Sequence, residues 1–139
     1  MRFMIIVKAT AESEAETRPA PEEALLAEMV DYHEQLSKAG VLLDASGLKP
    51  SSQGWRIRYN GGTRSVIDGP FAETKELIAG YTLIQVKSGE EALEWARRFP
   101  NPVGAGKPAE IEVRQLYELD DFAPSASIER FRDMDVGAR

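Results

Sequence analysis

The chain contains more strand-like segments than two helical segments can cover. Within the first 117 residues, long helical patterns occur at residues 21–39 and 88–99, whereas patterns typical of strands cover residues 3–7, 41–48, 55–59, 64–68, 81–86 and 110–116. Two helices cannot cover both faces of a sheet this large, so we expect them to share one face. The order β-α-β, hairpin, β-α-β therefore predicts an α+β fold.

Local signals set the ends of these segments. Pro21 suits the first turn of a helix, and Gly40 suits its C-terminal stop. Residues 60–62, Asn-Gly-Gly, are typical of a tight hairpin turn between two short strands. Ser88 and Glu91 have the spacing of a capping box and predict the start of the second helix. The polar residues between the first strand and Pro21, positions 10–20, are expected to form a loop.

Composition narrows the class of protein. A chain of 139 residues with 42% hydrophobic residues suits one domain with one core. The net charge of −6 argues against nucleic acid as a partner. One histidine and no cysteine argue against a metal site, and no sequence typical of a nucleotide or phosphate loop predicts a cofactor. The apolar N-terminal run is too short for a membrane span or a signal sequence, so a cytoplasmic location is the default expectation.

The face of the sheet that the helices leave uncovered must meet solvent or another subunit. Two such sheets that packed face to face would bury this surface and could leave a cavity between them. The sequence therefore predicts a homodimer.

The single histidine, His33, lies on the apolar side of the first helix. On a helical wheel it falls near the middle of a stripe formed by Leu25, Leu26, Met29, Val30 and Leu36. His33 could be an interior histidine that is simply hydrogen-bonded. It could instead be a proton-transfer group at the rim of a pocket, because an imidazole suits acid–base catalysis near neutral pH.

The segment DGPFAETKE, residues 68–76, combines a turn, an aromatic residue and alternating charges directly after a strand. Asp-Gly-Pro forms a good turn by itself, so the segment could be purely structural. Alternatively, Asp68 could accept a hydrogen bond from His33, which would fix the imidazole tautomer and raise its basicity.

The same segment resembles the signature of the DGPF branch of the YCII-related family. The residues similar to the family continue through GVLL and GLKP after the first helix, Gly80-Tyr81, EALEWA in the second helix and the final strand. The resemblance extends from Met1 to about Leu116. We therefore assign residues 1–117 to a YCII-related domain and residues 118–139 to a C-terminal tail.

The resemblance implies a ferredoxin-like fold that dimerises into an α+β barrel. It also implies a site formed by a histidine of the first helix and an aspartate, for which His33 and Asp68 are the candidates. One relative is similar to a lactone dehydrochlorinase. Genes of this branch often lie beside extracytoplasmic-function sigma factors, which suggests a regulatory context.

Two functions and a purely structural role follow from these residues. As an enzyme, the protein would use His33 and Asp68 for metal-free proton transfer on a small acid or lactone. Arg114 would hold a substrate carboxylate, with Tyr81 and Glu73 as weaker candidates for the cavity wall. As a non-catalytic dimer, the protein would bind a small molecule or a regulatory protein through the same residues. In a structural role, these residues would affect only stability.

The tail contains one helix-like pattern. Ser127 is a candidate cap for a short helix that presents Ile128, Phe131 and Met134 on one side, and this helix could pack on the partner subunit.

Overall fold

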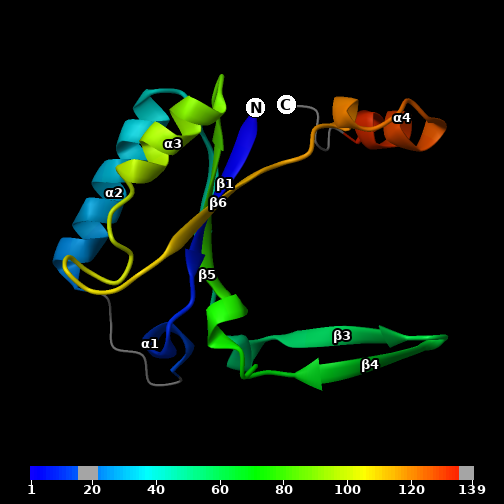
Figure 1. Ribbon diagram of the computed structural model, residues 1–139, viewed down its shortest axis with the longest axis horizontal. Helices are drawn as coiled ribbons and strands as arrows, with labels where there is room; N and C mark the ends of the chain where they lie inside the picture. The colour runs from blue at the N-terminus through cyan, green and yellow to red at the C-terminus, as the bar shows by residue number, and fades with distance from the viewer. Residues whose placement is uncertain (16–21, 135–139) are drawn as a thin grey trace.

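The computed structural model describes residues 1–15 and 22–134. Its main sheet contains β1 (Arg2–Lys8), β2 (Leu42–Gly47), β5 (Ile78–Gln85) and β6 (Ile111–Gln115), all antiparallel in the order β2-β5-β1-β6. Helices α2 (Glu23–Lys38) and α3 (Gly89–Arg97) cover one face (Figure 1). The α+β prediction is confirmed, and the arrangement is consistent with a ferredoxin-like fold.

The core lies between this sheet and the two helices. Ile5 of β1, Ile84 of β5 and Leu36 of α2 are fully buried at its centre. Residues of β1 and β5 alternate between the two faces, so that Phe3 lies opposite Ile84 and Ile5 lies opposite Thr82 on the covered side. Burial of these aliphatic side chains fixes α2 on the sheet.

The apolar side of α2 is rotated from the predicted stripe. Tyr32, which the stripe left out, is buried beside Leu36, whereas Leu26 and Val30 are 45% and 55% exposed. Residues 32 and 36 lie one helical turn apart and point at the sheet together. His33 therefore lies at the edge of the buried side of α2 and is only partly buried.

A short helix, α1 (Ala11–Glu14), occupies the start of the predicted 10–20 loop. The prediction was wrong there because Thr10 and Ser13 form a reciprocal capping box, which satisfies two free backbone N–H groups. Residues 16–20 of that loop and the predicted first turn at Pro21 lie outside the described residues.

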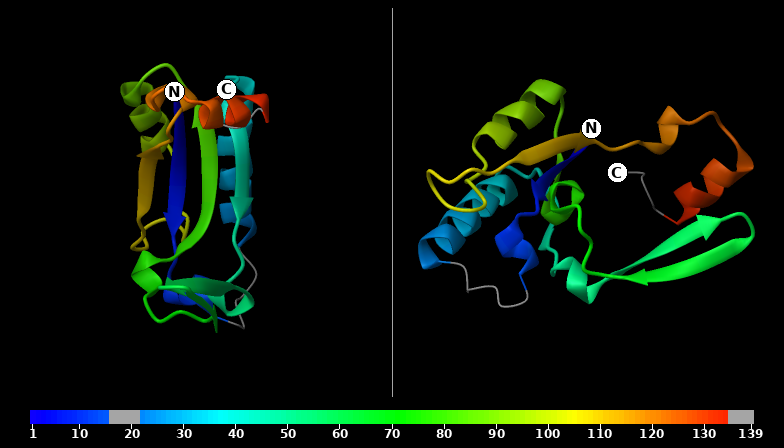
Figure 2. Two further views of the ribbon diagram at one scale, coloured as in Figure 1. Left: turned by 90° about the vertical axis from the view of Figure 1, so that its right-hand side faces the viewer. Right: turned by 60° about the horizontal axis from the view of Figure 1, so that its bottom comes forward.

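Strands β3 (Trp55–Asn60) and β4 (Thr63–Asp68) form the predicted hairpin as a separate two-stranded sheet. Gly61 in its turn has a φ of 61°, which glycine adopts without strain. The hairpin projects from the side of the main sheet opposite α2 and α3 (Figures 1 and 2). The open face of the sheet is thus flanked by this hairpin at one end of its strands.

A network of hydrogen bonds holds the base of the hairpin. The Glu14 carboxylate accepts from the backbone N–H and the hydroxyl of Ser51, in the turn η1 (Ser51–Gln53). The Ser51 hydroxyl oxygen accepts from the N–H of Phe71, and the Arg56 guanidinium lies 3.8 Å from the centre of the Phe71 ring. The 3-10 helix η2 (Thr74–Glu76) follows Phe71. The DGPFAETKE segment is therefore built into the framework.

The chain leaves β6 through η3 (Leu119–Asp121) and ends its described part in α4 (Ala126–Asp133). Arg2 anchors the start of this tail through an ion pair with Glu118 at 2.9 Å. Ser125 caps α4 by accepting from the N–H of Ile128, so the predicted cap at Ser127 was wrong. Ser125 has the extended backbone that a cap needs, whereas Ser127 already lies in the first helical turn.

We expect Gly69→Ala to destabilise the protein. A Cβ atom at this position would lie 1.8 Å from the Ser51 carbonyl oxygen, so the backbone would have to move. Such overpacking costs about 1–3 kcal/mol, measurable as a lower free energy of urea unfolding. Gly62→Ala is the matched control, since a Cβ there meets nothing within 4 Å. Equal stability of the two variants would contradict the close approach.

Candidate functional site

A cavity of about 780 Å³ lies between α2 and the covered face of the sheet. Its walls come from α1, α2, the ends of β1 and β2, the first half of β5 and the loop that follows α3. Most of the wall is apolar, and it includes Leu25, Leu26, Met29, Val30, Phe99 and Val103. His33 and Thr82 contribute hydrogen-bonding groups to this wall. Such a concave, mostly apolar space with few polar groups is typical of a small-molecule site.

The hydrogen bonds of His33 define its neutral tautomer. Nδ1 lies 2.7 Å from the backbone carbonyl oxygen of Met29, and Nε2 lies 2.9 Å from the hydroxyl of Thr82. A carbonyl oxygen can only accept, so Nδ1 carries the proton and donates it. In the neutral ring Nε2 then accepts from the Thr82 hydroxyl. The basic nitrogen of His33 is therefore held against β5, in the wall of the cavity.

Local structure places both members of this pair. His33 follows Met29 by four residues, so its ring can reach back to the carbonyl of the preceding turn. The ring packs edge-on near Tyr32 and Phe99, at centroid distances of 5.5 and 6.2 Å. Thr82 is 2% exposed and shares the covered face with Ile84.

Sequence reasoning missed Thr82, although a signal was present. Thr82 is a polar residue inside an apolar strand pattern, two residues before Ile84. The period-two alternation therefore assigns it to the buried face. A buried hydroxyl needs a hydrogen-bond partner, and His33 on the helix above is that partner.

Asp68 and His33 are not brought together within the single chain. Both ring nitrogens of His33 have other partners among the described residues, namely Met29 and Thr82. Asp68 is exposed at the end of β4, opposite Trp55 in the hairpin register. The hairpin and α2 lie on opposite sides of the main sheet (Figure 1).

The remaining predicted residues also divide between different places. Arg114 lies on the open face of the sheet, where it forms an exposed ion pair with Glu112 at 3.3 Å. Tyr81 adjoins the cavity, but it lies opposite Ile6 in the register, so its side chain is on the open face. There its hydroxyl donates to Asp44 at 2.9 Å, a bond that raises the pKa of this tyrosine. Glu73 is exposed beside η2. Arg114 and His33 thus lie on opposite faces of the sheet.

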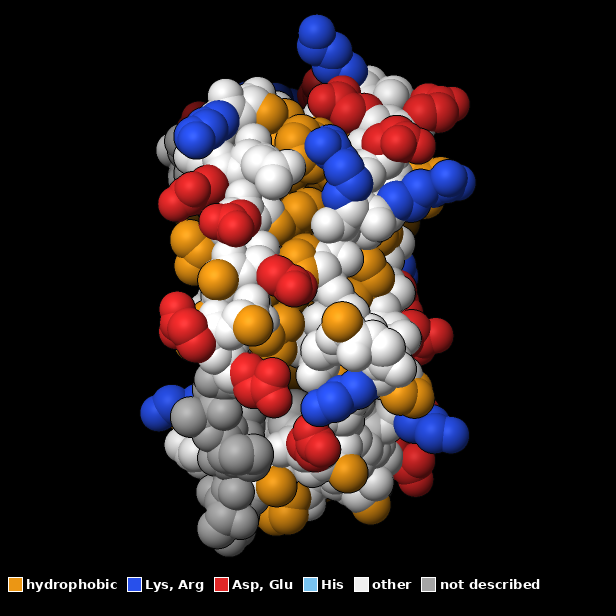
Figure 3. Space-filling view, turned by 90° about the vertical axis from the view of Figure 1, so that its left-hand side faces the viewer, with side chains coloured by type: hydrophobic (Ala, Val, Ile, Leu, Met, Phe, Trp, Pro, Cys, Tyr) orange, Lys and Arg blue, Asp and Glu red, His pale blue; other side chains and the backbone are white. Residues whose placement is uncertain are grey.

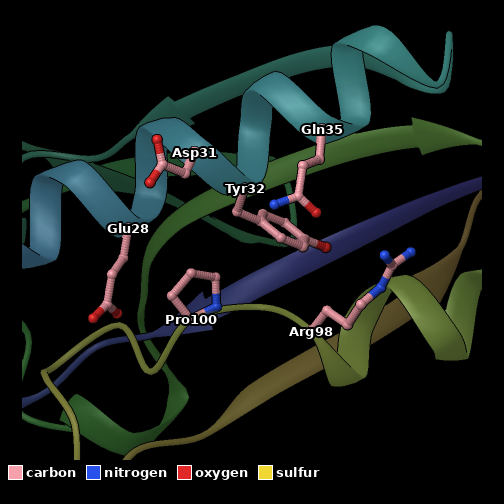
Figure 4. A pocket seen from close by; sticks show the side chains of 6 residues that line it. All are labelled: Glu28, Asp31, Tyr32, Gln35, Arg98 and Pro100. Carbon is pink, nitrogen blue, oxygen red and sulfur yellow. The ribbon is translucent and has the colours of Figure 1, made fainter.

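A shallower pocket of about 380 Å³ lies between α2 and the end of α3. Figure 4 shows Glu28 and Arg98 at its two ends and the Tyr32 ring between them. The Tyr32 hydroxyl donates to the Trp95 carbonyl at 2.7 Å. Burial raises the pKa of Tyr32 to about 12, although the Arg98 guanidinium acts in the opposite direction. Tyr32 joins the two helices and has a structural role here.

The described residues contain no group of three or more His, Cys, Asp or Glu side chains placed to hold a metal ion. On the helix-covered side, acidic and basic side chains are interspersed (Figure 3). Within residues 1–15 and 22–134, no helix has both the length and the apolar composition needed to cross a membrane.

Comparison with known proteins identifies the family. A model of the YCII-related domain matches residues 1–118, so the chain belongs to the YCII-related family. It is also similar to an uncharacterised protein of Rhizobium meliloti (strain 1021), with 32% identity over 97 residues, which are 70% of this chain and 78% of that protein. The match to the family model ends at residue 118.

We expect the alkaline stability of the protein to depend on Tyr32. Its pKa is raised from 10.0 to about 12 in the folded state, so the neutral hydroxyl stabilises the fold fully below pH 10. This contribution is lost as the pH rises toward 12. Urea unfolding across this range should show a smaller loss of stability in Tyr32→Phe than in the wild type. Tyr59→Phe, at a position that is 66% exposed, is the control and should follow the wild type.

We expect the neutral His33 ring to be the Nδ1–H tautomer. A long-range ¹H–¹⁵N NMR spectrum reports this directly, because the protein contains one histidine. Thr82→Val should cost about 1–3 kcal/mol of unfolding free energy, since it leaves the partly buried Nε2 of His33 without a partner.

Thr63→Val is the matched control for Thr82→Val. The Thr63 hydroxyl lies in an exposed turn, where it donates to the backbone carbonyl of Asn60 and has no contact with an imidazole. An Nε2–H tautomer in the wild type would contradict the assigned hydrogen bonds.

Proposed function

We propose that this protein binds a small molecule in the cavity between α2 and β5, with His33 and Thr82 as its polar contacts. The hydrogen-bonded pair in an otherwise mostly apolar wall is the observation that supports this proposal. An apolar wall favours the carbon skeleton of a ligand. When the Thr82–His33 hydrogen bond opens, Nε2 can accept from the ligand and the Thr82 hydroxyl can donate to it, which fixes the orientation of the ligand. Ligand binding would need only this pair and the apolar wall, and no further catalytic residue.

Metal-free acid–base chemistry is the second candidate, and the tautomer of His33 favours it. With its proton on Nδ1, the ring has an unprotonated Nε2, which could act as a general base once the Thr82 hydroxyl releases it. The Met29 carbonyl performs the orienting role that the sequence assigned to Asp68. Proton abstraction from a small acid or lactone would then use His33, with the Thr82 hydroxyl next to it.

Two cationic side chains make a carboxylate-containing ligand reasonable. Lys8 and Lys107 both line the cavity, together with Glu12 and Glu22. An ammonium group can offset the charge of a ligand carboxylate. Arg114, Glu73 and Asp68 receive no role in this proposal, since Arg114 and Asp68 lie on the other side of the sheet from His33.

The open face of the sheet supports a homodimer as the functional unit. Met4, Ile6 and Leu83 point to this face and are only partly buried in one chain. A second copy would remove this apolar surface from water, which is the main favourable term in association.

An NMR screen of small carboxylic acids and lactones tests the proposed function. The ring signals of His33 should shift saturably with a ligand, and the thermal unfolding midpoint should rise. His33→Gln should weaken binding by about tenfold, as expected for one lost hydrogen bond of roughly 1.4 kcal/mol. The control Thr63→Val should bind as the wild type does.

The same samples separate an enzyme from a binder. Loss of substrate signals, or exchange of a carbon-bound proton with D₂O, would show acid–base turnover. Saturable binding without either change would identify a binding or regulatory dimer. Binding that is equally strong in His33→Gln would contradict the assigned site.

A further inference from the structure

The loop between α3 and β6, residues 98–110, forms one part of the cavity wall. Figure 1 shows this loop, in yellow, beside α2, and both line the same cavity. The loop residues that line it are Phe99, Pro102, Val103, Gly104 and Lys107. The ring centre of Phe99 lies 6.2 Å from that of His33. The loop therefore begins beside the polar pair of the cavity and brings a charged residue of its own, Lys107, to the wall.

The side chain of Asn101 fixes the shape of this loop. Its Oδ1 accepts from the N–H of Val103 at 3.0 Å, and its Nδ2 donates to the carbonyl oxygen of Lys107 at 2.8 Å. Two backbone turns lie between these bonds, because the N–H of Gly104 donates to Asn101 and the N–H of Lys107 donates to Gly104. Gly104 and Gly106 have φ angles of 124° and 79°, which glycine adopts without strain. One amide group thus closes the loop from residue 101 to residue 107.

The closed loop places Lys107 at the cavity. A Cβ atom on Gly104 would lie 3.8 Å from Cδ and 3.9 Å from Cε of Lys107, so the aliphatic part of this lysine passes close to Gly104. Among the residues that the structure describes, ion pairs are formed by Arg2, Arg114 and Arg132, and none by Lys107. The ammonium group of Lys107 is therefore available to a ligand.

Three other charged residues line the cavity, namely Lys8, Glu12 and Glu22. Glu12 and Glu22 are exposed, on α1 and at the start of α2, and Lys8 is the last residue of β1. Lys107 differs from them because a polar side chain, that of Asn101, binds its own backbone carbonyl and so holds its Cα in place. A charge on a fixed backbone loses less freedom when it binds a ligand.

We propose that Lys107 binds the carboxylate of the ligand and that Asn101 is the positioning residue that holds Lys107 at the cavity. This inference rests on the proposed binding function and adds the class of ligand to it. A carboxylate gains a charge-assisted hydrogen bond from the ammonium group, whereas a neutral lactone gains only a weaker one. The apolar wall receives the carbon skeleton. The ligand is therefore an apolar carboxylic acid rather than a lactone.

Three probes with the same carbon chain test this assignment. Octanoate, octanamide and octylamine differ in carrying a negative charge, no charge and a positive charge. Each is titrated into the protein, and the ring signals of His33, the single histidine, report binding in the cavity. Lys107→Gln removes the charge at the loop. Lys87→Gln is the matched control for net charge, since Lys87 is exposed and is not among the residues that line the cavity. Thermal unfolding shows that each variant is folded.

The wild type and Lys87→Gln should bind octanoate about fivefold more tightly than octanamide, as expected for a favourable ion pair with an exposed lysine. In Lys107→Gln the affinity for octanoate should fall to that for octanamide, while the affinity for octanamide stays the same. Asn101→Ala should lower the ratio of the two affinities. A purely structural role of Asn101 would instead weaken both probes equally, and an unchanged ratio would overturn its positioning role.

Other outcomes overturn the assignment of Lys107. Equal affinities of the wild type for octanoate and octanamide would do so and leave the proposed cavity function in place. Tighter binding of octylamine would assign the charge recognition to Glu12 and Glu22. A preference for octanoate that is lost in Lys8→Gln but kept in Lys107→Gln would assign it to Lys8. If no probe shifts the His33 signals saturably, the proposed binding function itself fails together with the inference.

Discussion

The packing of α2 on one face of the four-stranded sheet is the constraint on which the rest of the structure depends. Leu36 is fully buried against Ile5 and Ile84, and this contact fixes the rotation of the helix. That rotation places Tyr32 in the core and His33 at the side of it, in the wall of the cavity. Because α2 and α3 both pack on this face, the other face stays open, and the β3–β4 hairpin flanks it at one end.

The position of His33 on α2 shows how a lone histidine can be oriented without a carboxylate. The backbone carbonyl of the preceding turn accepts a hydrogen bond from Nδ1–H, and the hydroxyl of the buried Thr82 donates one to Nε2. Because a carbonyl and a hydroxyl hold the ring in place of a carboxylate, the wall of the apolar cavity contains no ion pair at this position. In the proposed function, a ligand would compete with the Thr82 hydroxyl for Nε2.

The DGPFAETKE segment owes its special residues largely to packing. Gly69 passes so close to the Ser51 carbonyl that a side chain would clash, and the N–H of Phe71 is bound by the Ser51 hydroxyl. Arg56 lies over the Phe71 ring. These contacts anchor the hairpin to the turn before it and to Glu14. Asp68, at the edge of this region, is exposed and oriented by the hairpin register.

The sequence alone determined the order of the strands and of the helices α2 and α3, the hairpin and its turn, the stop at Gly40 and the position of the last strand, because these follow from local periodicity and turn chemistry. It also placed His33 near the interior. The tertiary structure decided which residue His33 meets, since a helix contacts a strand 49 residues later and no local pattern encodes that distance. It likewise placed Arg114 on the opposite face from His33. Alternation along one strand fixes relative sides, but only packing decides which side a helix covers.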